Sequence, residues 1–105
     1  SAGIPPRTVE AKVVQDADRL DALGAIGVAR CIAVGTALGR SLYGPDDPFC
    51  ERRQPDDSGA SVDHFYAKLL KLAGTMQTAA GRREAGRRTA FIHAFIAQLR
   101  SEIEP

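Results

Sequence analysis

Apolar residues recur at helical spacing through most of the chain, and this pattern constrains the fold more than any other feature. Near the C-terminus, Phe91, Ile92, Phe95, Ile96 and Leu99 fall on one face of a helix. The sequence contains no alternating β-branched run, no Asn-Gly or Asp-Gly turn and no internal repeat. These observations predict an all-α fold. The length of 105 residues allows one small domain, over residues 1–105.

Four helices are predicted, separated by glycine and by turn-forming residues. They cover about 8–23, 25–38, 61–73 and 75–103. Thr8 and Ser61 are suitable N-caps for the first and third helices, and Gly39 is a natural residue to follow the second. Proline, aspartate and glycine are dense in the loop 40–60. A loop of this length is often functional or mobile.

Charge and targeting signals exclude several classes of protein. Lys and Arg total 14 and Asp and Glu 13, so the chain lacks the basic excess of a dedicated nucleic-acid binder. The arginines of residues 82–88 have no interleaved aromatic residues, which favours a solvated face over nucleic-acid contact. No signal peptide and no uninterrupted membrane span are recognisable. We therefore expect a cytoplasmic protein without a membrane partner.

Three carboxylates, Asp16, Asp18 and Asp21, lie close together on the first predicted helix. A helical wheel places Asp16 beside Val13 and places Asp18 on the opposite side, with Val14. Both sides are apolar or small, so this helix is expected to be covered nearly all round. A buried carboxylate must be paired, hydrogen-bonded or bound to a metal. The residues alone favour neither ion pairing nor metal ligation.

Several segments resemble one enzyme family. Residues 10–27 read EAKVVQDADRLDALGAIG and resemble the HD-domain metal-dependent phosphohydrolases, in particular the small bacterial HD hydrolases. The motifs DPF at 47–49, DHF at 63–65 with KLLKL at 68–72, and TMQT at 75–78 follow in the order of that branch. The resemblance covers essentially the whole chain. It implies a helical bundle that corresponds to the C-terminal part of an HD domain.

The family holds a divalent metal with a His, a His-Asp doublet and a final Asp, which precedes a basic or small residue and then a hydrophobic one. Here that pattern is Asp18, followed by Arg19 and Leu20. The resemblance therefore implies that Asp18, rather than Asp16, is the catalytic metal ligand. The ion would be of the Mn, Mg, Fe, Co or Ni type. It would polarise a phosphoryl oxygen and lower the pKa of a bound water.

The chain departs from the family in its histidines. The family's His and His-Asp ligands precede the final Asp, but none of the seventeen residues before Asp18 is His. The histidines present, His64 and His93, precede Phe and Ala. We therefore expect the C-terminal part of a phosphohydrolase that acts on a phosphoester or a nucleotide, inactive or nearly so by itself. The alternative is a non-catalytic α-helical interaction module that keeps the HD scaffold.

Basic side chains near these motifs are candidates for binding substrate phosphate. Arg19 either neutralises a phosphate or pairs with a neighbouring carboxylate. His64 and Lys68 share a helix face and, with Lys71, either line the mouth of the site or form a solvated face. His93 is expected to be a packing histidine. We also expect exposed apolar surface that would support a homo-oligomer.

Overall fold

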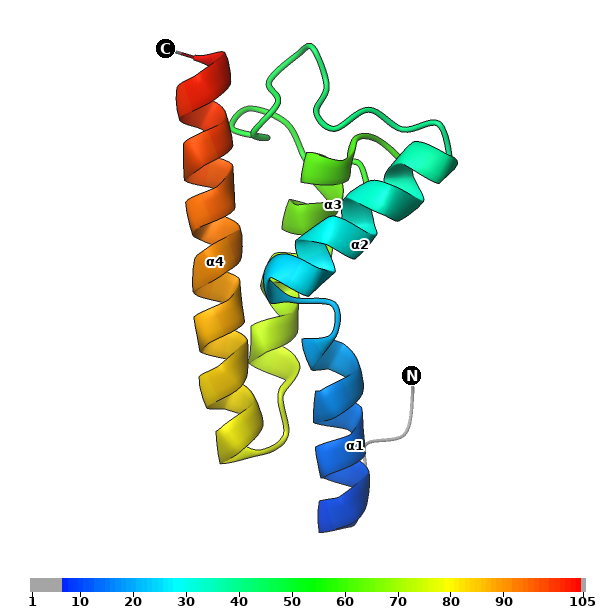
Figure 1. The fold of residues 1–105 in the computed structure, drawn as a ribbon, viewed down its shortest axis with the longest axis vertical. Coiled ribbons are helices and arrows are strands. Elements are labelled where there is room, and N and C mark those ends of the chain that lie inside the picture. The colour runs from blue at the N-terminus through cyan, green and yellow to red at the C-terminus, as the bar shows by residue number, and fades with distance from the viewer. Residues whose placement is uncertain (1–6, 105) are drawn as a thin grey trace.

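The computed structural model describes residues 7–104, and all of the regular structure in this range is helical (Figure 1). This confirms the all-α prediction. Helix α4 runs along one side of the molecule, and α2 and the 3₁₀ helix η1 pack against it (Figure 1). Helix α1 contacts α4 near the beginning of that helix. The elements are α1 (Val9–Leu20), α2 (Gly24–Ala37), α3 (Ser61–Ala67), η1 (Leu69–Thr75) and α4 (Ala79–Ile103).

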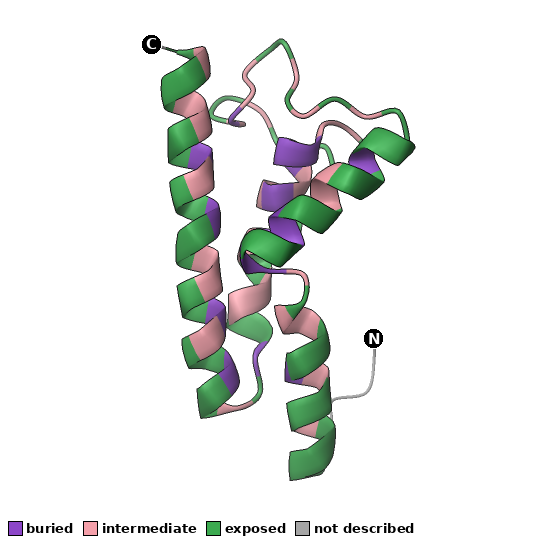
Figure 2. Ribbon diagram, in the orientation of Figure 1, coloured by how far each residue is buried: buried purple, intermediate pink, exposed green. Residues whose placement is uncertain are grey.

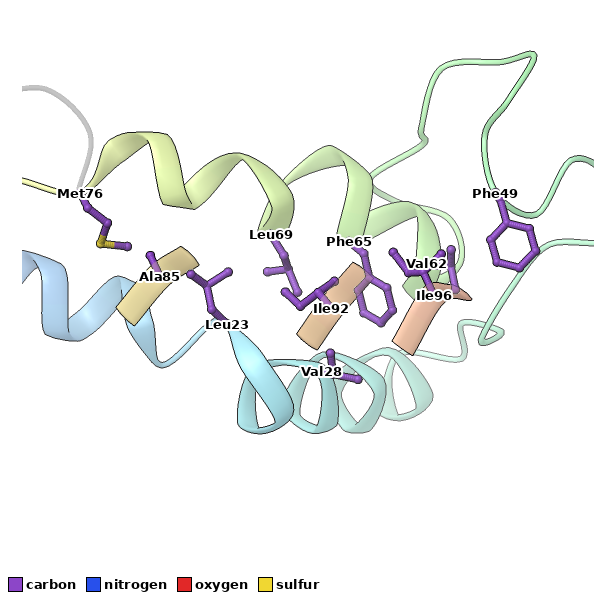
Figure 3. Packing of buried hydrophobic residues seen from close by; sticks show 10 residues of the cluster. All are labelled: Leu23, Val28, Phe49, Val62, Phe65, Leu69, Met76, Ala85, Ile92 and Ile96. Atoms are coloured by element: carbon purple, nitrogen blue, oxygen red, sulfur yellow. The ribbon is translucent and has the colours of Figure 1, made fainter. Parts of the chain in front are cut away.

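The hydrophobic core lies between α4 and the elements that face it (Figure 3). Phe65 is completely buried and meets Phe95 edge to face, with ring centroids 6.0 Å apart. Burying a side chain of this size contributes about 1.5–3 kcal/mol. The buried apolar side chains are Leu23, Val28, Phe49, Val62, Phe65, Leu69, Met76, Ala85, Ile92 and Ile96.

The third predicted helix is divided in two. Helix α3 ends at Ala67 because Lys68 takes a non-helical backbone conformation, with φ −127° and ψ −60°. The chain then continues as η1. The N-cap of α3 is Ala60 and not Ser61, whereas Thr8 caps α1 as predicted and Gly39, with φ +79°, follows the end of α2.

The last helix begins later than predicted, at residue 79 instead of 75. The residues between η1 and α4 include Met76 and Thr78, which are extended. The Thr78 hydroxyl caps α4 by accepting a hydrogen bond from the backbone N–H of Gly81. Because the chain is extended before α4, the backbone N–H groups of Gln77 and Thr78 can donate hydrogen bonds to another element.

Helix α1 is exposed over most of its surface, which corrects the expectation that it is covered all round. The side chains of Val9, Val13 and Val14 are 71%, 51% and 67% exposed, and Figure 2 shows most of α1 in the colour of exposed residues. Helix α2 likewise exposes Ile26 and Val34. The expected exposed apolar surface is therefore present. The sequence pattern failed here because it records which faces are apolar and not whether a neighbour covers them.

The exposure of α1 accompanies an elongated shape. The described residues extend over 47 × 25 × 24 Å, with a radius of gyration of 14.7 Å, against about 13 Å for a compact domain of this length. No single helix within residues 7–104 is long and apolar enough to cross a membrane; α1 and α2 meet that test only as a pair bent by 60°. His93 is exposed on α4, so the expectation of a packing histidine was wrong.

Candidate functional site

A cavity of about 320 Å³ lies among α1, α2 and α3. This volume is within the range of small-molecule sites. Its lining combines acidic groups from α1 and its C-terminal end with basic groups from the other elements. The lining residues are Asp18, Asp21, Ala22, Gly27, Arg30, Cys31, Val34, Gly35, Arg40, Ser61, His64 and Leu69.

Glycines at close contacts shape this cavity. The turn between α1 and α2 uses Gly24 with φ +71°, a conformation that other residues adopt only with strain. A Cβ on Gly27 would lie 2.2 Å from the carbonyl oxygen of Ala22, and one on Gly35 would lie 2.5 Å from the Ser61 hydroxyl. The tight turn and the close approach of α2 to α3 bring the C-terminal end of α1 to the cavity wall.

Asp16 has a structural role that the sequence did not predict. Its side chain is 3% exposed and accepts hydrogen bonds from the backbone N–H groups of Gln77 and Thr78, both at 2.8 Å, and from the Thr78 hydroxyl at 2.7 Å. Burial alone raises the pKa of Asp16, but these hydrogen bonds outweigh it, and the pKa lies below its usual value. Both oxygens are thus engaged in joining α1 to the beginning of α4.

Asp18 lies in a different environment on the same helix. It is exposed and lines the cavity. None of the ion pairs among the described residues involves Asp18 or Asp21. The ion pairing that the sequence left open for these two carboxylates is therefore not found, and the carboxylate of Asp18 faces a space that a ligand can enter.

His64 is held by a residue of the preceding loop. His64 lines the cavity, and its Nδ1 lies 2.5 Å from Oδ1 of Asp57. The second carboxylate oxygen of Asp57, Oδ2, is 3.9 Å from Nζ of Lys68. Asp57 itself is not part of the cavity wall. The structure therefore brings Asp18 and His64 to one cavity and turns Lys68 towards Asp57.

Arg19 and Lys71 also lie outside the lining. Nη1 of Arg19 donates to the carbonyl oxygen of Thr75 at 2.9 Å, and Lys71 is exposed. In contrast, Arg30 and Arg40 line the cavity, and sequence reasoning missed both. The sequence does carry a signal for Arg30, since it is the single charged residue of the apolar α2.

The arginines of residues 82–88 do not reach the cavity. Arg87 and Arg88 form ion pairs with Glu84 at 2.6 and 2.7 Å. Arg88 also donates to the carbonyl oxygen of Leu20 at 2.7 Å, which joins α4 to the end of α1. Two of the four arginines in this run therefore have intramolecular partners, in keeping with a structural role.

The described residues do not supply a complete metal centre. Within residues 7–104, no group of three or more His, Cys, Asp or Glu side chains could hold a metal ion. A divalent ion in a protein needs several such ligands at once. Asp18 offers one carboxylate, so the donors present here do not fit a complete divalent-metal site.

Comparison with known proteins relates the chain to larger ones. No family model matches it. The uncharacterized protein YpgQ of Bacillus subtilis strain 168 is 40% identical over 98 residues, which are 93% of this chain and 42% of YpgQ. The crystal structure of YpgQ in complex with ADP matches with a TM-score of 0.78 at 41% identity, covering 94% of this chain and 46% of that one.

A crystal structure of an HD-superfamily hydrolase from Bacillus thuringiensis matches equally well. Its TM-score is 0.78 at 44% identity, and the match covers 93% of this chain and 48% of that one. The chain thus spans less than half the length of each of these relatives. Over that shared part, the protein is homologous to YpgQ and to the HD-superfamily hydrolase, and its all-helical fold matches part of theirs.

Proposed function

We propose that the chain is the substrate-binding part of a divalent-metal-dependent phosphohydrolase that acts on a nucleotide or another phosphoester. The supporting observation is the cavity lined by Arg30, Arg40 and His64 together with Asp18. Guanidinium groups bind phosphate through strong, charge-assisted hydrogen bonds. The presence of ADP in a crystal structure of YpgQ supports a nucleotide as the ligand.

The position of Asp18 supports its proposed role as a metal ligand. A carboxylate beside a phosphate is repulsive unless a cation lies between the two anions. When bound, a divalent ion would polarise the phosphoryl group and activate a water molecule. Because the described residues complete no such site, we expect this chain alone to be inactive or nearly so, with Asp18 as one ligand of the parent enzyme's metal.

Binding of ADP to the 105-residue chain tests the proposed cavity. Replacing Arg30 or Arg40 by alanine is expected to weaken ADP binding about tenfold, because each loses a charge-assisted hydrogen bond to phosphate. Arg82→Ala is the matched control, because Arg82 is exposed on α4 outside the cavity. Calorimetric titration gives the dissociation constants. Equal affinity in all three variants and the wild-type chain would exclude the cavity as the phosphate site.

Hydrolysis is measured separately from binding. With ADP and Mn²⁺, the chain alone is expected to release no phosphate above the background of buffer. A clear rate that Asp18→Ala abolishes would contradict the expectation that the described donors are insufficient, while leaving the proposed role of Asp18 intact.

The second candidate function, a non-catalytic interaction module, is favoured by the exposed apolar residues of α1 and α2, including Val9, Val14 and Ile26. This candidate predicts self-association or partner binding that is independent of ADP. Sedimentation of the wild-type chain and of a Val9→Ser, Val14→Ser double variant measures self-association. A monomer at all concentrations in both proteins would remove the support for the proposed homo-oligomer.

A further inference from the structure

His64 lines the cavity and also contacts Asp57, which lies outside the cavity. A carboxylate accepts hydrogen bonds, so the 2.5 Å contact places the hydrogen on Nδ1 of His64 and makes it the donor to Asp57. Nε2 is then the ring nitrogen that remains for a ligand.

Hydrogen bonds hold the residues on either side of Asp57, although Asp57 lies on an exposed loop. The backbone N–H of its neighbour Asp56 donates to Oδ2 of Asp63 at 2.8 Å. Asp63 is 2% exposed and also accepts from both terminal nitrogens of Arg53, at 2.5 and 3.0 Å. On the other side, the backbone N–H of Ser58 donates to Asp56 at 3.0 Å. The residues that flank Asp57 are therefore tied to the ion pair between Arg53 and the buried Asp63.

Lys68 contributes to the same arrangement from the end of α3. Its Nζ is 3.9 Å from Oδ2 of Asp57, and the side chain is 61% exposed. Oδ1 is used by His64, so the two carboxylate oxygens face two different basic side chains. Such an exposed ion pair contributes little stability. Its effect is to favour one orientation of the Asp57 carboxylate.

From this geometry we propose that Asp57 is a positioning residue: it holds Nδ1 of His64 so that Nε2 points into the cavity and contacts a phosphate oxygen of the ligand. The proposal rests on the proposed function of the cavity. With phosphate and Asp57 at opposite edges of the ring, the imidazole donates a hydrogen bond at both nitrogens, which only its protonated form can do. Lys68 then acts on Asp57 and not on the ligand.

Nitrogen NMR of the histidine rings tests the proposal directly, because the chain has two histidines. In the wild-type chain without ligand, the His64 ring is expected to carry hydrogen on Nδ1. In Asp57→Ala this preference is lost, and the ring resembles that of His93, which is exposed and serves as an internal reference. An unchanged His93 signal and an unchanged circular dichroism spectrum show that the variant is folded.

Titration with ADP measures the consequence for binding. In the wild-type chain, ADP is expected to shift the Nε2 resonance of His64, whereas adenosine, which lacks phosphate, leaves it unchanged. Asp57→Asn is expected to raise the ADP dissociation constant about tenfold, because the neutral amide forms a weaker hydrogen bond with Nδ1 and no longer holds the ring firmly towards the phosphate. Asp46→Asn is the matched control, since Asp46 is an exposed carboxylate of the same loop.

Two results would overturn the positioning role: a wild-type His64 ring without hydrogen on Nδ1, or Asp57→Asn binding ADP as tightly as Asp46→Asn does. Failure of the wild-type chain to bind ADP would instead overturn the proposed function of the cavity. The hydrogen position on the free ring would then decide by itself whether Asp57 orients His64.

Discussion

Asp16 and Asp18 are two residues apart on α1 and have opposite environments. A helix turns by about 100° per residue, so the two side chains leave it on nearly opposite sides. Asp16 is buried against the beginning of α4 and accepts three hydrogen bonds, whereas Asp18 is exposed and lines a cavity without an ion-pair partner among the described residues. Identical carboxylates therefore have different surroundings according to which side of α1 they occupy.

The surroundings of the two carboxylates differ in the same way. Around Asp16, α1 packs on the beginning of α4, whereas Asp18 borders the cavity. The rest of the helix is largely open, with Val9, Val13 and Val14 all exposed. Variants that remove or crowd these carboxylates test the comparison.

Removing the Asp16 carboxylate is expected to have the largest effect on stability. Asp16→Ala leaves the N–H groups of Gln77 and Thr78 without their acceptor, at a cost of about 1–3 kcal/mol for each buried group left unpaired. We expect a total loss of about 3 kcal/mol in the free energy of unfolding. Asp18→Ala, at an exposed position, is expected to change it by less than about 0.5 kcal/mol. Urea unfolding of both variants measures the difference, and equal stabilities would refute it.

Crowding the Asp16 carboxylate is expected to cost less. A Cβ on Gly81 would lie 2.2 Å from Oδ2 of Asp16, whose three hydrogen bonds resist movement. Gly81→Ala is therefore expected to destabilise the chain by about 1–3 kcal/mol, as overpacking does. Gly86 lies on the same helix, and a Cβ added there would meet no atom within 4 Å, so Gly86→Ala is expected to stabilise by up to about 1 kcal/mol. Thermal unfolding that shifts equally in both variants would contradict this account.

The pH dependence of stability is expected to show how much the negative charge of Asp16 contributes. The hydrogen bonds of Asp16 hold its pKa in the folded state below the usual 3.8. Its contribution is therefore complete above pH 3.8 and is lost as the pH falls through the lowered folded-state value. The stability difference between the wild-type chain and Asp16→Asn should narrow in that acidic range. A difference that stays constant down to the lowest pH at which the chain folds would show that ionisation of Asp16 does not contribute.

Ligand protection of a cysteine is expected to give the smallest effect. Burial raises the pKa of the Cys31 thiol, which lines the cavity, so its alkylation should already be slow. ADP is expected to slow it further by a few-fold, while Cys50, which is outside the cavity, reacts at the same rate with and without ADP. Mass spectrometry of the two peptides measures both rates. Equal protection of the two cysteines would point to a general effect of ADP and not to occupation of the cavity.

Local patterns predicted much of the fold. The apolar spacing indicated the helices, and Thr8 and Gly39 marked two of their ends correctly. The division of the third helix at Lys68 and the late beginning of α4 were missed, although Thr78, the N-cap of α4, is a local signal for that beginning. The extended segment before α4 presents N–H groups to Asp16, and no local signal records a partner so distant in sequence.

The candidate site was harder to predict. The resemblance to HD hydrolases selected Asp18 over Asp16, a choice that the helical wheel could not make. The basic side chains of the cavity were predicted only in part, because Arg30 and Arg40 reach it through the packing of α2 against α3. The role of Asp57 depends on the folding of a loop around the buried Asp63, and loop geometry of this kind has no sequence periodicity.

The most direct test of the central claim, that Asp18 and not Asp16 serves the ligand, is the effect of Mn²⁺ on the dissociation constant of ADP. In the wild-type chain, Mn²⁺ carried by the nucleotide is expected to strengthen ADP binding, because it relieves the repulsion between phosphate and Asp18. In Asp18→Asn, ADP without Mn²⁺ should bind at least as tightly as it does to the wild-type chain without Mn²⁺, and added Mn²⁺ should strengthen binding less than in the wild-type chain, because only Asp21 remains as an acidic residue of the lining. An equal gain from Mn²⁺ in both proteins would contradict the account.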